Sequence, residues 1–291
     1  MAIHLGQHLA RLTDQLRFEP VTRRIRASHA GHPVLDSTGA ALVWEPRRVV
    51  PMYAVPPADL LADLTPCPPP PMPAAADLPP VLGPAHFGWH LADGRSYAVH
   101  VAGRSFEAAA FAPADPDLGG RLILAWQPFD WVEEAQPVSG HPHDTFHRID
   151  VLRSERHVVV SLGGQVLADS HRPLALYETG LPVRWYLPRD DVRTDLLTPS
   201  PTTSVCAYKG EAGYLSFSAA ADAGTDVAWT YPQPVHEAAP IKDHVCFYAE
   251  RTDLQVDGVA APRPRTMWSP PDPAGGGPAG PGRALGRGAD A

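Results

Sequence analysis

The sequence has no excess of basic residues, no long apolar segment and no paired cysteines. Its 291 residues include 24 Lys and Arg against 32 Asp and Glu, which gives a net charge of −8. An acidic chain lacks the positive surface that a phosphate backbone requires, so we expect no nucleic-acid partner. No segment approaches the roughly 20 apolar residues of a transmembrane helix, so we expect no membrane partner either.

The N-terminal residues lack the uninterrupted apolar core of a signal peptide, because charged and histidine side chains separate the leucines. We therefore expect a cytoplasmic protein. The three cysteines, Cys67, Cys206 and Cys246, are odd in number and far apart in the sequence. This pattern argues against a disulfide framework and against a four-cysteine zinc site, and we expect no cofactor.

Proline, in contrast, is abundant, and most of the chain consists of short apolar runs bounded by glycine, proline and aspartate. This texture predicts β-strands. Gly163 and Gly164 separate two such runs, 158–162 and 166–168, and predict a hairpin turn because glycine reaches the positive φ of primed turns. The expected fold class is mainly β, with two tandem small antiparallel β-domains, a short N-terminal helix and a disordered C-terminal tail.

The two ends of the chain differ from its body. Within residues 1–20 we predict an amphipathic helix, which either docks on the body or binds a partner, from leucines spaced four, three and four apart: Leu5, Leu9, Leu12 and Leu16. From residue 261 to residue 291 the chain offers almost nothing to bury, which predicts a disordered tail.

Between these ends we predict a first β-domain at residues 21–153 and a second at residues 154–260. Eleven prolines at residues 56–84 predict a polyproline-like insertion in the first domain, since proline cannot donate to a sheet ladder. The two domains are predicted as copies, because residues 28–55 shifted by 133 positions give seven identities. Residues 125–150 shifted by 103 positions give nine more, which align Trp126 with Trp229.

Several segments resemble the bacterial "domain of unknown function 427" family, whose members are often tandem copies. In the second copy the resemblance lies in residues 168–170, 176–192, 206–210 and 228–232, and in the first copy in residues 43–48, 131–134 and 141–144. It implies a small β-tent domain, in which two antiparallel sheets enclose a pocket. The family also has a nucleotidyltransferase label, but this chain has neither a glycine-rich phosphate loop nor a close pair of metal-binding aspartates.

The resemblance places a candidate ligand site in the second copy, which has the more complete set of motifs. We expect a small polar or aromatic ligand between aromatic walls, although Trp229 is interpreted first as a core residue. The candidate ligand-binding residues are Glu178, Arg184, Tyr186, Asp191, Tyr208, Lys209, Trp229 and Tyr231. A glycine at position 210 is expected to let a ligand approach the backbone closely.

Two other classes of function stay open. An enzyme of transferase or hydrolase type could use Glu178, Cys206 and Lys209, with the lysine stabilising a thiolate, although an inert buried cysteine is the expected state. An interaction module could instead use the leucine helix, the proline-rich insertion and the tail as docking segments for protein partners.

A metal site is not expected, although the spacing of His141, His143 and His147 leaves a histidine cluster as an alternative. Motifs that recur in both copies are interpreted as structural. Asp and Ser at positions 36–37 and 169–170 are predicted to bond nearby backbone amides. Glu45 and Glu178 are each predicted to pair with an arginine, Arg184 being the candidate partner of Glu178, because an unpaired carboxylate in an apolar run is costly.

Overall fold

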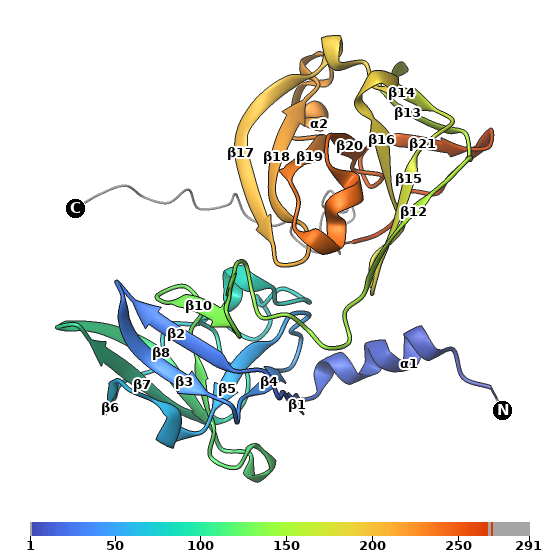
Figure 1. The fold of residues 1–291 in the computed structure, drawn as a ribbon. Helices are drawn as coiled ribbons and strands as arrows, with labels where there is room; N and C mark the ends of the chain where they lie inside the picture. The colour runs from blue at the N-terminus through green and yellow to red at the C-terminus, as the bar shows by residue number, and fades with distance from the viewer. Residues whose placement is uncertain (1, 267–268, 270–291) are drawn as a thin grey trace. The chain divides into compact units, whose positions relative to one another are not determined.

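The computed structural model describes residues 2–266 and residue 269. The chain forms two compact units, Met1–Asp144 and Thr145–Ala291, and each contains two antiparallel sheets (Figure 1). The predicted mainly-β fold is therefore confirmed. The division between the units comes before strand β12 (Ile149–Arg153), whereas the sequence analysis placed the boundary after it.

The first unit contains a seven-stranded and a four-stranded sheet. In sheet order, the larger one consists of β1 (Arg17–Pro20), β4 (Ala41–Trp44), β5 (Met52–Val55), β9 (Leu122–Leu124), β8 (Arg104–Pro113), β7 (Gly94–Val101) and β6 (Asp63–Pro66). The smaller one consists of β11 (Gln136–Val138), β10 (Asp130–Glu133), β2 (Ile25–His29) and β3 (His32–Ser37). Apolar side chains of both sheets, among them Ile25 of β2 and Leu42 of β4, form one core.

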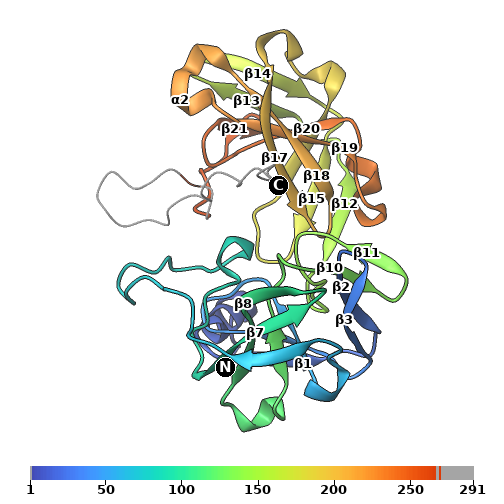
Figure 2. The ribbon, with the colours of Figure 1, turned by 90° about the vertical axis from the view of Figure 1, so that its left-hand side faces the viewer.

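The second unit also contains a seven-stranded and a four-stranded sheet. The larger one consists of β12, β15 (Leu174–Glu178), β16 (Arg184–Pro188), β20 (His244–Phe247), β19 (Ala228–Gln233), β18 (Gly210–Ser216) and β17 (Thr198–Cys206) (Figure 2). The smaller one consists of β14 (Gln165–Ser170), β13 (Val158–Leu162), β21 (Asp253–Val256) and β22 (Val259–Ala260). Gly163 and Gly164 join β13 to β14 at φ values of +59° and +80°, so the predicted hairpin is confirmed.

The strand orders of the two units correspond position by position. Offset by 133 residues, β4 takes the place of β15 and β5 that of β16, as the first self-alignment predicted. The second self-alignment is wrong. Trp126 follows β9, which corresponds to β20, whereas Trp229 lies in β19, which corresponds to β8. The ungapped match therefore superposes segments that occupy different places in the two units.

Two faces of the larger sheet in the second unit are buried in different ways. Leu187 and Val245 face the four-stranded sheet and pack with Val158 and Leu167. Their strand neighbours on the opposite face form a second cluster, which is covered by the 3₁₀ helix η8 (His236–Ile241). This cluster contains Tyr186, Trp229, Tyr231 and Cys246 from the strands and Ala238 and Ile241 from η8. Strand alternation therefore places the aromatic residues outside the layer between the sheets.

The N-terminal helix is present but shorter than predicted. Helix α1 spans Leu5–Arg11, the 3₁₀ helix η1 spans Leu12–Asp14, and Arg17–Pro20 belong to β1. The docking expectation is wrong for the first two leucines, because Leu5 and Leu9 are 63% and 52% exposed. In the described part of the chain no helix is long and apolar enough to cross a membrane.

The remaining helical segments are short, and most of them follow a strand. They are η2 (Pro57–Asp59), η3 (Pro84–His86), η4 (Pro116–Leu118), η5 (Arg189–Asp191), η6 (Thr194–Leu196), η7 (Ser218–Ala220) and α2 (Ala221–Gly224). Within the proline-rich segment 56–84, β6 is an edge strand, where proline is tolerated. Residues 261–266 form no helix or strand, and the rest of the predicted tail, except Ser269, lies outside the described residues.

Candidate functional site

A group of three polar side chains lies at the end of β15 in the second unit. Glu178 is the last residue of that strand, and Lys209 lies in the turn between β17 and β18. The Lys209 Nζ donates to Glu178 Oε2 at 2.5 Å, and His147 Nε2 lies 3.0 Å from Glu178 Oε1. His147 precedes β12, where Ile149 is the register partner of Glu178. We call Glu178, Lys209 and His147 the carboxylate cluster.

The carboxylate cluster keeps Glu178 ionised in a nearly closed environment. The side chain of Glu178 is 6% exposed and that of Lys209 is 10% exposed. Burial alone would raise the pKa of Glu178, but the hydrogen bond from His147 and the charge of Lys209 lower this pKa to about 2. A carboxylate with so low a pKa is a weak proton acceptor, which disfavours Glu178 as a general acid or base.

The predicted aromatic walls are largely buried in this structure. Tyr208 is 8% exposed and its ring stacks on His147, with the ring centroids 4.3 Å apart. Trp229 and Tyr231 are 7% and 5% exposed and belong to the cluster beneath η8. The Trp229 Nε1 donates to the Tyr186 hydroxyl at 3.1 Å. Trp229 is therefore a core residue, and Tyr208 is the ring that the fold places beside the carboxylate cluster.

Arg184 belongs to a second buried ion pair. Its two terminal nitrogens donate to Glu250 Oε2 and Oε1 at 2.8 and 2.7 Å, and Thr266 Oγ1 donates to Glu250 Oε1 at 2.6 Å. The prediction that Arg184 pairs with Glu178 is wrong: Lys209 and His147 are the side chains that contact Glu178. The sequence could not separate these partners, because both glutamates follow aromatic or apolar runs.

Asp191 belongs to a third polar group. It accepts hydrogen bonds from Ser170 Oγ at 2.7 Å and from two nitrogens of Arg172. Ser170 Oγ also accepts the backbone amide of Arg172, and Ser37 Oγ accepts that of Gly39 in the first unit. The structural interpretation of the recurrent serines is therefore confirmed.

The conformation of the turn that contains Lys209 accounts for the glycine at position 210, and no ligand is needed to explain it. Gly210 has a φ of +92°, and an added Cβ would lie 3.0 Å from the backbone oxygen of Gln233. The backbone of Gly210 therefore lies close to Gln233, the last residue of β19, and not to a ligand. Cys206, paired with Gly210 across the turn, is partly exposed, whereas Cys246 is buried and burial raises its pKa to about 12.

The three histidines of the alternative metal site lie in different environments. His141 is buried and bonds to the carbonyl of Pro142, and His143 bonds to Glu133. His147 bonds to Glu178 in the second unit. In the part of the chain that the structure describes, these three histidines do not form a group of converging ligands.

The first unit has its own buried carboxylate, Glu133 at the end of β10. It contacts His143 Nδ1 at 3.0 Å, Arg23 Nη1 at 2.9 Å and the hydroxyl of Tyr53. Burial would raise the pKa of Glu133, but the hydrogen bonds from His143 and Tyr53 lower it to about 2. Sequence reasoning missed Arg23 and Tyr53 here, since 110 and 80 residues separate them from Glu133.

Glu45, which corresponds to Glu178, is bound differently. Its Oε1 accepts the backbone amides of Leu91 and Ala92 at 2.9 and 3.1 Å, and its Oε2 contacts His90 at 2.9 Å and Arg48 at 3.4 Å. The predicted pairing with an arginine is confirmed for Glu45. The Glu45 side chain is 1% exposed and its partner Arg48 is completely buried, so this position in the first unit is part of the core.

A cavity in the second unit lies near the Arg184–Glu250 pair and has a volume of about 10 Å³. Its lining includes Arg184, Trp185, Phe247 and Thr252. This volume is enough for about one water molecule and too small for an organic ligand, which needs a few hundred Å³. We therefore place the candidate site at the carboxylate cluster and Tyr208.

Residues 150–258 match the family described as Domain of unknown function (DUF427). The matched residues belong to the second unit and include its strands β13 to β21. It includes Glu178, Tyr208 and Lys209, whereas His147 precedes the matched residues. No curated protein matches the chain. The description of the DUF427 family assigns no activity, so function must be argued from the site.

Proposed function

We propose that the second unit binds a small molecule through a carboxylate, phosphate or carbonyl group that accepts a hydrogen bond from Lys209. The observation that carries this proposal is the hydrogen bonding of the Lys209 ammonium. An ammonium has three N–H donors, and in the described contacts Nζ uses one of them, for Glu178. The remaining donors are aimed by the Glu178 carboxylate, which fixes the position of Nζ.

The pairing of Lys209 with Glu178 favours binding over proton transfer. Glu178 stays ionised at neutral pH, so it holds Lys209 in place as a fixed counter-charge and hydrogen-bonds to His147. Tyr208 stacks on His147 and places an aromatic ring next to the Glu178–Lys209 ion pair. A ligand that combines an acceptor group with a flat ring would match this combination, which agrees with the small polar or aromatic ligand expected from the sequence.

The contrast between Glu178 and Glu45 supports a site in the second unit. Glu45 is held by two backbone amides, Arg48 and His90, whereas Glu178 is contacted by His147, which precedes β12, and by Lys209 in the turn between β17 and β18. We further propose that the units are tandem copies in which the second has kept a binding role. The corresponding order of their sheets supports this interpretation. A bacterial origin remains the expectation from the resemblance, and a cytoplasmic location the expectation from the N-terminal sequence.

A thermal-shift screen tests the proposal with a matched control. The chain has two lysines, Lys209 and the exposed Lys242. Aromatic carboxylates and nucleoside monophosphates should raise the melting temperature of the wild type and of Lys242→Met but not of Lys209→Met, because a ligand that binds the native state stabilises it. The double variant Glu178→Gln/Lys209→Met, which buries no lone charge, provides a second test if the single variant unfolds.

Equal stabilisation of the wild type and the Lys209 variants would contradict the proposal, as would no stabilisation by any of these compounds. In the first case the ligand binds elsewhere. The second case would favour the hypothesis of an interaction module, which is supported by the exposure of Leu5 and Leu9 in α1. Deleting residues 1–11 should then abolish association with a partner.

The transferase or hydrolase alternative depends on Cys206 acting as a nucleophile next to Lys209. This alternative also includes nucleotidyl transfer. It requires that Cys206→Ser abolish turnover of a bound compound while leaving its binding intact. The low pKa of Glu178 counts against this alternative, since the carboxylate closest to Lys209 would neither accept nor donate a proton near neutral pH.

A further inference from the structure

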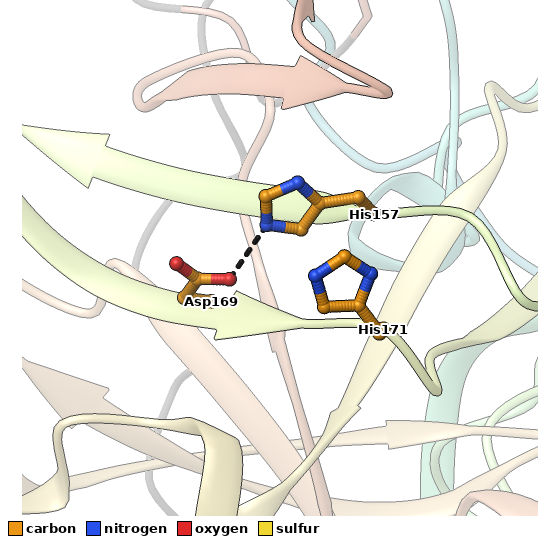
Figure 3. Close-up of side chains that lie close together, drawn as sticks. All are labelled: His157, Asp169 and His171. Atoms are coloured by element: carbon orange, nitrogen blue, oxygen red, sulfur yellow. Dashed lines mark hydrogen bonds and ion pairs between the residues drawn. The ribbon is translucent and has the colours of Figure 1, made fainter.

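A group of two histidines and one aspartate lies at one end of the β13–β14 hairpin, away from the residues of the proposed ligand site in sequence and sheet. His157 precedes β13, Asp169 lies in β14, and His171 follows β14. Figure 3 shows the two imidazole rings next to each other, with the carboxylate of Asp169 at the edge of the His157 ring. No function described above uses these three side chains.

The strand register brings the three side chains together. Val158 pairs with Ser170 and Val159 with Asp169, so the next position outward sets His157 opposite His171. Asp169 and His171 are two residues apart and point to the same face of the hairpin. One ligand atom from each of the three side chains lies within 4.8 Å of the others. The His157 Nε2 is 2.7 Å from Asp169 Oδ1, and the two rings are stacked with centroids 4.0 Å apart.

The first unit has a cation at the same position, supplied by the chain. Arg24 corresponds to His157, Asp36 to Asp169 and Thr38 to His171. The Arg24 Nε donates to Asp36 Oδ1 at 2.7 Å, so a guanidinium neutralises that carboxylate at every physiological pH. In the second unit the carboxylate remains, but two imidazoles replace the arginine and the threonine. Neutral imidazoles supply lone pairs, so this hairpin can accept its cation from solution.

We propose that His157, Asp169 and His171 bind a divalent transition-metal ion, with Zn²⁺ as the ion to test. Two imidazole nitrogens and one carboxylate oxygen are a ligand set that Zn²⁺ uses, with the fourth position left to water. Ligand atoms about 2.05 Å from a tetrahedral ion lie about 3.3 Å from one another. The side chains of His157 and Asp169 are 35% and 59% exposed, so they have room to rotate to that spacing.

Zinc titration of the tag-free, chelator-treated full-length protein tests the proposal. Isothermal titration calorimetry should find one Zn²⁺ bound per second unit in the wild type. His157→Arg is the informative variant because it recreates the Arg24–Asp36 pair of the first unit and should keep the hairpin folded. We expect this variant and His171→Gln to weaken binding at least tenfold. Co²⁺ bound to the wild type should show the absorption bands of a four- or five-coordinate ion, and these bands should be absent in His157→Arg.

A control variant separates this site from a second histidine pair. His4 and His8 lie four residues apart at the start of α1 and could bind metal weakly. His8→Gln should leave the zinc affinity of the hairpin site unchanged. Equal zinc binding by the wild type, His157→Arg and His171→Gln would overturn the proposal, and so would loss of binding in His8→Gln alone. None of these results depends on Lys209 or its ligand.

Discussion

Replacing Glu178 with glutamine should destabilise the protein by an amount that depends on pH. In the native state the pKa of Glu178 is about 2, against an ordinary value of 4.5. A shift of about 2.5 pKa units corresponds to about 3 kcal/mol of stability supplied by the ionised form. Because the native pKa is the lower one, this contribution is fully present above pH 4.5 and is lost as the pH falls toward 2.

The magnitude can be followed through the titration. Between neutral pH and pH 3, about 2 kcal/mol of the Glu178 contribution should be lost, since the unfolded chain is then mostly protonated and the native carboxylate is not. Glutamine cannot ionise, so Glu178→Gln lacks this contribution at every pH. The difference in free energy of unfolding between wild type and variant should therefore shrink by about 2 kcal/mol from pH 6 to pH 3.

Urea denaturation at a series of pH values measures this difference. Glu211→Gln, which replaces an exposed glutamate of β18, is the matched control and should differ from the wild type by less than about 0.5 kcal/mol throughout. Other carboxylates, Glu133 included, titrate equally in wild type and variant and cancel in the comparison. A difference between wild type and Glu178→Gln that is the same at pH 6 and pH 3 would refute the reasoning.

Three further predictions concern the same unit. Arg184→Met should lower the free energy of unfolding by about 3–5 kcal/mol, because it leaves Glu250 buried without its cation. Replacing the exposed Arg172 with methionine should lower it by less than about 1 kcal/mol, and urea denaturation measures both changes. Gly210→Ala should lower the melting temperature more than Gly164→Ala, since both have positive φ but an added Cβ meets the Gln233 carbonyl at position 210 alone. A thiol reagent at neutral pH should label Cys206 no faster than a model thiol and leave Cys246 unlabelled in the native protein.

Much of the fold could be predicted from local sequence patterns. The glycine pair at 163–164 requires positive φ, and it determined the β13–β14 hairpin correctly. The offset of 133 residues placed Glu45 and Glu178 at matching strand ends. The second offset failed because it relied on identities without regard to strand order, so that Trp126 was matched to Trp229 in a strand at a different place in the sheet.

The candidate site could be predicted only in part. One motif predicts Tyr208 and Lys209 as site residues. In the structure Lys209 contacts Glu178 and Tyr208 stacks on His147. The pairing itself was not predictable, since Glu178 is 31 residues from both His147 and Lys209, and a second buried glutamate, Glu250, takes Arg184 as its partner. Leu5 and Leu9 show the limit of periodicity, which predicts an apolar stripe but not what covers it.

The most direct test of the central claim is acylation of the two lysines in the presence of a stabilising compound from the screen. Quantitative mass spectrometry separates Lys209 from Lys242 after reaction with an amine-selective ester. We predict that the compound slows acylation of Lys209 at least fivefold and leaves the rate at Lys242 unchanged. Unchanged acylation of Lys209 by a reagent that reaches it, at a saturating concentration of the compound, would contradict a binding site at the carboxylate cluster.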